Sequence, residues 1–302
     1  MIIAAIEAGG TKFVLGIYRA DCLGDKAPEL LARSTVPTTS PEETLSLSAG
    51  FFEAEAEKHG KAEALGIGSF GPVELQISSP EWGWITATPK PGWRNTDIAG
   101  WFRRRLALPV AFDTDVNAAA CGEHLWGRAR GVDNFVYITV GTGIGGGLFC
   151  GGNLVHGLAH PELGHILSKR FPDDSFEGIC PYHGDCLEGL ASGPAIANRW
   201  GIKAEDLPEG HPAWDLEARI LARAFATYAL VASPELIILG GGVGLRPGLA
   251  EKVSLLVGKE LAGYIPAMTR PGRLEGFVAR PSLGGEAGLA GSAALALRLC
   301  TE

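Results

Sequence analysis

Residues able to ligate a metal are concentrated between positions 156 and 186, which hold four of the seven histidines and two of the six cysteines. Cys180, His183 and Cys186 stand three positions apart, so they place three soft or borderline ligands on one short loop. His165 is the candidate for a fourth ligand. Two cysteines and two histidines complete a tetrahedral zinc site of the closed, structural kind. We therefore predict a structural zinc ion held by these four residues.

The same segment leaves a hydrolytic alternative open. His160-Pro161-Glu162 faintly resembles the H-x-E pattern of zinc deaminases, and His160 and His165 are one position too far apart for the H-E-x-x-H motif. Catalytic zinc keeps one coordination position open for water, whereas four protein ligands close it. Zinc-dependent hydrolysis is therefore the weaker hypothesis.

Two glycine-rich turns, at residues 8–11 and 141–147, each connect two predicted strands. Backbone N–H groups in such turns can bind phosphate, although for a single hairpin the favoured explanation is an ordinary tight turn. A repeat of this kind is what a duplicated α/β domain around a nucleotide would produce. Residues 66–71 and 141–146 match G-x-G-x-x-G, but neither match opens a helix, so we exclude an NAD-binding fold.

Asp113-Thr114-Asp115 lies where a predicted strand ends and a predicted helix begins. The open N–H groups and the dipole of a helix N-terminus favour a carboxylate over its neutral form. A carboxylate there is ready to accept a proton, so Asp115 is a candidate base. The alternative, which position alone favours, is that one of these aspartates is a helix cap.

The composition limits the class of protein. The chain has 302 residues, of which 46% are hydrophobic, and a formal net charge of −8 without a dense Lys/Arg run, which argues against nucleic acid or an anionic membrane as partner. The apolar N-terminal run is broken by Glu7, and residues 135–159 hold too many glycines for a bilayer helix. We expect a cytoplasmic protein whose partner is a small molecule or another protein.

The alternation of strand and helix patterns places the chain in the α/β class. Residues 80–101, with four of the seven tryptophans, are predicted to form a loop that lies near a binding surface or covers one. We predict strands at 2–7, 12–18, 64–70, 110–113 and 236–239, a second strand-turn-strand pass from 134, and helices at about 41–58, at 115–126 and at the C-terminus.

Five motifs together resemble the ROK family of sugar kinases and sugar-responsive repressors, in which the zinc-containing bacterial fructokinases are most similar. In chain order these motifs are residues 7–12, 115–119, 142–147, 162–165 and 180–188. The resemblance implies a two-domain actin-like, hexokinase-like (ribonuclease H-like) α/β fold with ATP in a cleft. The implied small domain is 1–112 with the C-terminal helix at about 287–302, and the large domain, 113–286, carries the zinc loop and the sugar and ATP sites.

The activity that the resemblance implies is that of an ATP-dependent hexose kinase, most similar to fructokinases that make fructose 6-phosphate. Mannose, glucose or another hexose is the alternative substrate, and a non-catalytic sugar sensor is a further one. A homodimer is implied, with ATP, Mg²⁺ and one structural Zn²⁺ per chain. No DNA-binding helix-turn-helix is expected before the first hairpin. Two departures from the family pattern are Glu7, where most members have Asp, and Thr114, where many have Asn.

The resemblance also assigns roles to individual residues. Asp115 is implied as the base for the sugar 6-hydroxyl. The implied sugar-binding residues are Asn117, Glu162, His165, Glu188, Gly71 and Trp93, although core packing explains the tryptophan-rich loop equally well. The implied ATP-binding residues are Gly9, Gly10, Thr11, Lys12, Thr142, Gly143, Pro194, Gly240, Gly241, Gly242, Val243 and Gly244.

Overall fold

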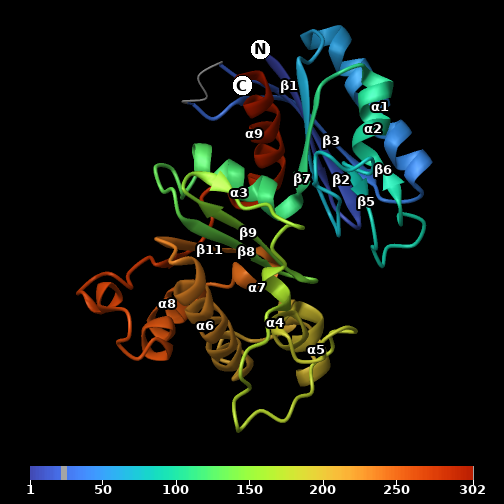
Figure 1. The fold of residues 1–302 in the computed structure, drawn as a ribbon. Coiled ribbons are helices and arrows are strands. Elements are labelled where there is room, and N and C mark those ends of the chain that lie inside the picture. The colour runs from blue at the N-terminus through green and yellow to red at the C-terminus, as the bar shows by residue number, and fades with distance from the viewer. Residues whose placement is uncertain (22–25, 302) are drawn as a thin grey trace. The chain divides into compact units, whose positions relative to one another are not determined.

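The computed structural model describes residues 1–21 and 26–301, which form two compact units (Figure 1). Unit 1 comprises residues 1–131, 154–160 and 282–301. Unit 2 comprises residues 132–153 and 161–281. The chain therefore leaves unit 1 twice and returns to it twice.

Unit 1 is built on a five-stranded mixed sheet in the order β3-β2-β1-β4-β7. β1 pairs antiparallel with β2, which pairs antiparallel with β3, whereas β1, β4 and β7 run parallel. All residues of β4 are buried, as expected for a central strand covered on both faces. The strands are β1 (Ile2–Ala8), β2 (Lys12–Arg19), β3 (Glu29–Pro37), β4 (Ala64–Ser69) and β7 (Val110–Thr114).

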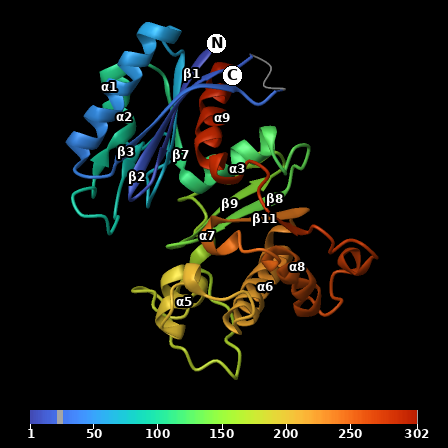
Figure 2. The same cartoon turned by 180° about the vertical axis from the view of Figure 1, so that it is seen from behind.

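Helices cover both faces of this sheet, as Figures 1 and 2 show. α1 (Pro41–His59) and α2 (Ile98–Leu106) bury Phe52 and Phe102 in one core with Ile67 of β4. α9 (Ala287–Thr301) lies on the opposite face, where Leu289 packs in a second core with Ile3 of β1. α3 (Asp115–Trp126) packs beside α9, and a short hairpin joins β5 (Trp84–Ile85) to β6 (Thr96–Asp97).

Glycines allow α9 to approach its neighbours closely. A Cβ atom at Gly66 of β4 would lie 1.8 Å from the Ser292 carbonyl oxygen, and one at Gly291 would lie 1.8 Å from the Ala118 carbonyl oxygen. No side chain fits at either position without movement of the backbone. The glycines of β4 are therefore packing residues, in agreement with the exclusion of a dinucleotide-binding loop there.

Unit 2 repeats the same plan with a sheet in the order β10-β9-β8-β11-β12. A hairpin of β8 and β9 is extended by β11 and β12, which run parallel to β8. α6 and α8 pack against each other, and their buried faces share one core with this sheet. The strands are β8 (Phe135–Val140), β9 (Ile144–Cys150), β10 (Asn153–Leu154), β11 (Leu236–Gly240) and β12 (Val278–Ala279).

The helices of unit 2 include short ones that carry candidate site residues. The α-helices are α4 (Leu187–Ala191), α5 (Gly193–Trp200), α6 (Ala213–Ala232), α7 (Gly241–Gly244) and α8 (Leu249–Glu260). The 3₁₀ turns η1 (Leu163–His165), η2 (Ala204–Asp206) and η3 (Pro266–Thr269) belong to the same unit, whereas η4 (Gly284–Glu286) precedes α9 in unit 1.

The α/β class is confirmed, but two elements differ from the sequence-based prediction. The predicted loop 80–101 is wrong in part, because it contains β5 and β6 and runs into α2. β3 was not predicted, and it pairs with β2 along nearly its whole length. The boundary predicted after residue 112 precedes α3, whereas α3 packs with α9 and β4 and so belongs to unit 1. Within the described residues, no helix combines the length and apolar character needed to cross a membrane.

Candidate functional site

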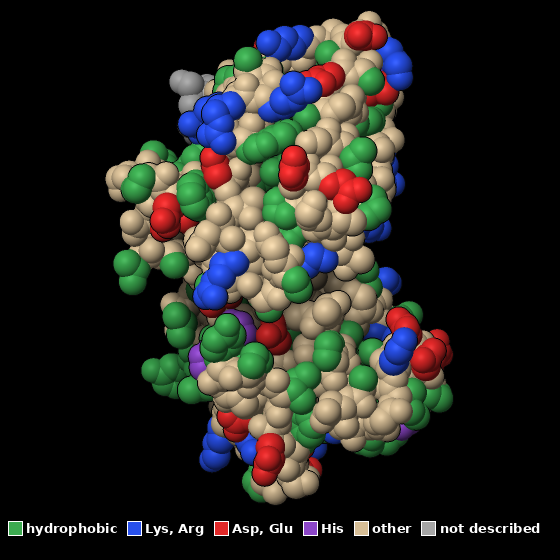
Figure 3. Space-filling model, turned by 90° about the vertical axis from the view of Figure 1, so that its right-hand side faces the viewer, with side chains coloured by type: hydrophobic (Ala, Val, Ile, Leu, Met, Phe, Trp, Pro, Cys, Tyr) green, Lys and Arg blue, Asp and Glu red, His purple; other side chains and the backbone are tan. Residues whose placement is uncertain are grey.

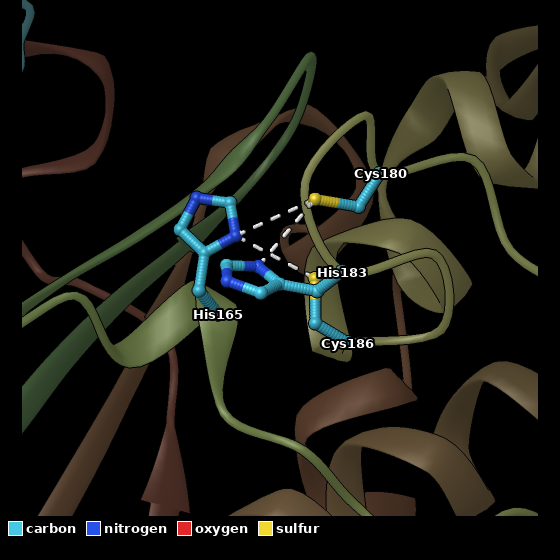
Figure 4. A group of neighbouring side chains, drawn as sticks. All are labelled: His165, Cys180, His183 and Cys186. Atoms are coloured by element: carbon cyan, nitrogen blue, oxygen red, sulfur yellow. Dashed lines mark hydrogen bonds between the residues drawn. The ribbon is translucent and has the colours of Figure 1, made fainter.

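Four side chains of unit 2 converge on one point, as Figure 4 shows. His165 ends η1, and Cys180, His183 and Cys186 lie on the loop before α4. Their ligand atoms all lie within 4.8 Å of one another. The His165 Nδ1 atom is 3.8 Å from the Cys180 Sγ atom and 3.5 Å from the Cys186 Sγ atom, and the His183 Nδ1 atom is 3.7 Å from the Cys180 Sγ atom.

These separations fit a tetrahedral zinc ion. Zn–S bonds of about 2.3 Å and Zn–N bonds of about 2.0 Å at tetrahedral angles put sulfur and nitrogen about 3.6 Å apart. Burial raises the pKa of the Cys186 thiol, and a bound cation would favour its thiolate form. Because all four positions are supplied by the protein, the cluster matches a structural site and leaves no position for a hydrolytic water.

His165 connects this cluster to the glycine hairpin of β8 and β9. Its Nδ1 atom faces the two sulfurs, and its Nε2 atom lies 4.0 Å from the Glu188 Oε1 atom. The other oxygen of Glu188 accepts a hydrogen bond of 2.9 Å from the Ile144 backbone N–H. A Cβ atom at Gly143 would lie 2.8 Å from that oxygen, so glycine permits the approach. The structure thus brings the predicted sugar residues His165 and Glu188 next to the predicted phosphate turn.

Glu162 precedes η1, and its carbonyl oxygen accepts a hydrogen bond from the His165 backbone N–H. Glu162 itself is exposed to solvent. Unit 2 therefore carries three of the predicted sugar-binding residues. Glu162 and His165 lie at η1, and Glu188 lies in α4.

A pocket of about 580 Å³ in unit 2 contains several of the predicted ATP-binding residues. Thr142 follows β8, Pro194 is the second residue of α5, and Gly242 and Val243 lie in α7, so three separate segments of the chain line one cavity. The Gly193 backbone N–H donates to the Gly141 carbonyl oxygen at 2.7 Å, which joins the start of α5 to the hairpin turn. The volume of the cavity falls within the range of small-molecule sites.

Only some of the glycines at 240–244 line this pocket. Gly241 has a φ of +82°, and a Cβ atom there would lie 2.4 Å from the Val140 carbonyl oxygen. Gly240, Gly241 and Gly244 therefore set the path of the backbone, and Gly242 and Val243 face the cavity. Sequence reasoning missed the other lining residues, which are Ala197, Lys203, Ala204, Glu205, Trp214 and Arg246. They come from α5, η2, α6 and the segment after α7, and no motif connects these elements in sequence.

The first glycine hairpin, residues 9–12, joins β1 to β2 in unit 1. The Gly9 backbone N–H donates to the Lys12 carbonyl oxygen at 3.0 Å, and the Gly9 carbonyl oxygen accepts from the Thr38 hydroxyl at 2.7 Å. Gly10, Thr11 and Lys12 are exposed. This turn is therefore fixed at its base and open at its tip.

Asp115 is the first residue of α3, as predicted, and is partly buried. Thr114 is the N-cap, and its hydroxyl accepts from the Asn117 backbone N–H at 3.1 Å. Thr114 rather than Asp115 therefore caps the helix, and the Asp115 Oδ1 atom accepts a hydrogen bond of 2.9 Å from the Val116 backbone N–H. The pKa of Glu7, in β1, is raised to about 7. Burial is the largest cause, and the negative charge of Asp115 is the next.

Two predicted sugar contacts do not fit the structure. Trp93 is 0% exposed in the core of unit 1, and its indole N–H donates to the Thr39 carbonyl oxygen at 2.8 Å, so its ring cannot stack on a sugar in this conformation. Asn117 is 1% exposed, and its amide donates to Asp113 at 2.6 Å, so it is a buried partner of Asp113 rather than a surface contact. Gly71 is partly exposed and precedes Pro72 in a cis peptide bond.

Acidic and basic side chains are interspersed on the face drawn in Figure 3, without a continuous basic area. Ion pairs also neutralise arginines of unit 1. Arg19 pairs with Glu29 at 2.7 Å, and Arg104 pairs with Asp97 at 3.0 Å.

Comparison with known proteins identifies relatives along nearly the whole chain. The model of the ROK family matches residues 3–299. The chain is 44% identical over 300 residues to a fructokinase of Zymomonas mobilis subsp. mobilis, covering 98% of this chain and 96% of that protein. A ROK hexokinase from Thermus thermophilus is 28% identical with a TM-score of 0.78, covering 99% of each chain. A ROK family glucokinase from Streptomyces griseus, solved with glucose and AMPPNP, is 28% identical with a TM-score of 0.75, covering 99% of this chain and 100% of that one.

Proposed function

Because the chain belongs to the ROK family, we propose that it is an ATP-dependent fructokinase, which transfers the γ-phosphoryl group of ATP to the 6-hydroxyl of fructose. The observation that carries this proposal is the identity of 44% to a fructokinase along 98% of the chain. Glucose is the second candidate substrate, because the S. griseus relative was solved with glucose and AMPPNP.

Phosphoryl transfer needs in-line positioning, neutralisation of charge and a group that takes the proton of the attacking hydroxyl. Asp115 is proposed as that group, because it is the first residue of α3 and its motif, residues 115–119, resembles that of the ROK sugar kinases. A carboxylate is a weak base for an alcohol, so the proton moves late, when the new bond is largely formed. Orientation of the hydroxyl by Asp115 therefore contributes more than its basicity.

ATP is proposed to bind in the pocket of unit 2 that Thr142, Pro194, Gly242 and Val243 line. Backbone N–H groups of the glycine turns at 9–12 and 141–143 would hold phosphate oxygens. Mg²⁺ bound to ATP would neutralise charge on those oxygens. No described side chain is assigned to the magnesium ion itself.

Sugar hydroxyls are proposed to be bound by Glu162, Glu188 and the Nε2 atom of His165. Zinc bound to His165, Cys180, His183 and Cys186 would orient the imidazole ring and fix the loop. Because the Nδ1 atom of His165 faces the sulfurs, only its Nε2 atom remains for a sugar.

Release of ADP measured with fructose, mannose, glucose and N-acetylmannosamine tests the substrate. We expect the highest kcat/KM with fructose. A higher kcat/KM with glucose would replace fructokinase by glucokinase, and no ADP release with any of the four sugars would refute the kinase proposal.

Substitution of Asp115 tests the mechanism. Asp115→Asn should lower kcat by about 10² to 10⁴ while the Kd for a nonhydrolysable ATP analogue stays unchanged, because loss of a positioned base costs that much and the proposed ATP pocket lies in unit 2. Asp97→Asn on the same unit, at the start of α2, is a matched control that should keep kcat. Wild-type kcat in Asp115→Asn would remove Asp115 from the mechanism.

A further inference from the structure

A hydrogen-bonded group of side chains surrounds the start of α3. Asp113, at the end of β7, is 4% exposed, and its carboxylate accepts three hydrogen bonds. These come from the Thr114 backbone N–H at 2.8 Å, the Asn117 amide at 2.6 Å and the His156 Nε2 atom at 2.9 Å. His156 and Asp113 are 43 residues apart in the sequence, so no local motif predicts their contact.

The chemistry of the acceptor decides the tautomer of His156. A carboxylate has no hydrogen to donate, so the His156 Nε2 atom carries one and donates it to the Asp113 Oδ2 atom. The Asn117 amide nitrogen, 3.5 Å from the His156 Nε2 atom, is a second donor to the same carboxylate and not an acceptor for the ring. The hydrogen bond to Asp113 raises the pKa of His156, which strengthens this donor.

Asp113 and its second side-chain donor, Asn117, flank Asp115 in the sequence. Asp113 precedes it by two residues, and Asn117 follows it by two on the first turn of α3. One oxygen of Asp113 holds both the Thr114 backbone and the Asn117 amide, and the Thr114 hydroxyl holds the Asn117 backbone. The backbone around Asp115 is thus fixed from both sides through Asp113.

His156 belongs to residues 154–160, the short segment of unit 1 that lies between two parts of unit 2 in the sequence. The Leu158 carbonyl oxygen of this segment accepts a second hydrogen bond from the Gln76 amide, at 3.2 Å. The His156 side chain is 39% exposed, so the bond to Asp113, rather than burial of the ring, is what holds it in place.

We propose that His156 is a positioning residue for phosphoryl transfer, which acts through Asp113 to hold the start of α3 and with it Asp115. This inference rests on the proposed function, in which Asp115 orients the sugar hydroxyl. Without His156, one oxygen of a buried carboxylate loses its partner, and Asp113 must turn or recruit water. A displacement of about 1 Å at the reacting groups can cost about 10² in rate.

Two substitutions separate this role from general stability. His156→Ala removes the donor and should lower kcat by about 10- to 100-fold. His156→Gln supplies an amide N–H in its place and should recover most of the lost kcat. In both variants the KM for ATP should stay within about twofold of wild type, because the proposed ATP pocket lies in unit 2. His59→Ala, at the end of α1, is the control and should match wild type.

Three outcomes would overturn the proposal: wild-type kcat in His156→Ala, equal loss in the alanine and glutamine variants, or a rise in the KM for ATP that accounts for the loss. Asp115→Asn, assayed alongside, distinguishes the two failures. If that variant keeps its kcat, the proposed base fails, whereas if it loses kcat and His156→Ala does not, only the present inference fails.

A measurement on the wild-type protein tests the geometry even if a variant does not fold. The ¹⁵N spectrum of histidine-labelled protein should show His156 as the Nε2–H tautomer above its pKa. The Nδ1–H tautomer would overturn the proposal, because its Nε2 atom could not donate to Asp113.

Discussion

At the scale of single residues, the surroundings of Glu7 disfavour the charged form of its carboxyl group. Its side chain lies against Gly288 at the start of α9, where a Cβ atom would come within 2.5 Å of the carboxyl group. Burial, then the charges of Asp115 and Glu286, raise the pKa of Glu7 to about 7, against the opposing effect of Lys12 and Arg33. The folded protein therefore retains a proton here that an unfolded chain releases.

This proton makes stability depend on pH. Between pH 4.5 and about 7 the folded state binds more protons at Glu7 than the unfolded state does, so the free energy of unfolding falls as pH rises through this window. The full change is about 3 kcal/mol. Glu7→Gln should remove this dependence, so the thermal midpoint of the variant should exceed that of wild type at pH 8 and approach it at pH 5.

Thermal unfolding followed by circular dichroism at pH 5, 6, 7 and 8 checks this prediction. Glu42→Gln, on the exposed first turn of α1, is the control and should keep the wild-type dependence. Parallel curves for Glu7→Gln and wild type would show that Glu7 does not titrate in this range.

At the scale of elements, the loop between Cys180 and Cys186 carries three of the four ligand residues, and two backbone hydrogen bonds between Cys180 and Gly184, of 3.1 and 2.9 Å, close it. Its sharpest bend is Gly184, with a φ of +62°, between the third and fourth ligands. We predict about one zinc ion per chain. Cys180→Ser should lower both the zinc content and, by about 5 to 10 °C, the thermal midpoint, since ligand binding free energy orders the loop.

Elemental analysis with thermal unfolding tests this expectation. Cys150→Ser, at the exposed end of β9 and outside the cluster, should keep both values. If Cys180→Ser contained as much zinc as wild type, the four-ligand site would be incorrect.

A second element-scale feature is the carboxylate of Glu123, on the last turns of α3, which is 0% exposed. It accepts from the Arg128 backbone N–H at 2.6 Å, and from the Ser282 and Leu283 backbone N–H groups at 3.2 and 2.8 Å. The Ser282 hydroxyl donates as well, at 3.1 Å. Glu123 thus joins α3 to the segment that leads into α9.

Glu123→Ala leaves several buried N–H groups without an acceptor and should destabilise the protein by about 2 to 4 kcal/mol. Denaturant unfolding measures this loss, with the exposed Glu251→Ala on α8 as the control. A change below about 1 kcal/mol would mean that water replaces the carboxylate at no cost.

At the scale of the whole molecule, α9 joins the C-terminal part of the chain to unit 1 by close packing against α3 and β4. Gly291→Ala should destabilise it by about 1 to 3 kcal/mol, because the new Cβ atom meets the Ala118 carbonyl oxygen. Gly50→Ala, inside α1 with nothing within 4 Å of the new atom, should instead stabilise by about 0.5 to 1 kcal/mol. Equal shifts of the thermal midpoint in the two variants would show that helix propensity, rather than packing, controls both.

Local patterns sufficed for much of this architecture. α3 begins and ends where its Ala-rich pattern predicts, and the hairpins of β1–β2 and β8–β9 follow from glycine turns between apolar runs. β3 was not predicted because most of its residues are exposed and only Val36 is buried, so it lacks the continuous apolar run of a buried strand. α2 was not predicted because its first residues, up to Trp101, were included in the Pro- and Gly-rich loop predicted at 80–101.

The candidate site divides in the same way. The ligand cluster is predictable because three of its members lie within seven residues of each other, and the fourth is the neighbouring His165. Trp93 was assigned to a ligand because composition does not distinguish a tryptophan in a binding loop from one in a core. The bond between His156 and Asp113 depends on tertiary packing over 43 residues, and a single sequence carries no signal for it.

The return of the chain to unit 1 through α9 has a consequence for biosynthesis. All of unit 2 precedes α9 in the sequence, so a ribosome releases unit 2 while the sheet of unit 1 still has one face uncovered. Domains generally fold as they emerge, the N-terminal one first. In this chain β1 and β2 are synthesised long before α9. We expect the apolar face around Ile3 and Val14 to stay uncovered on the nascent chain until α9 packs against it.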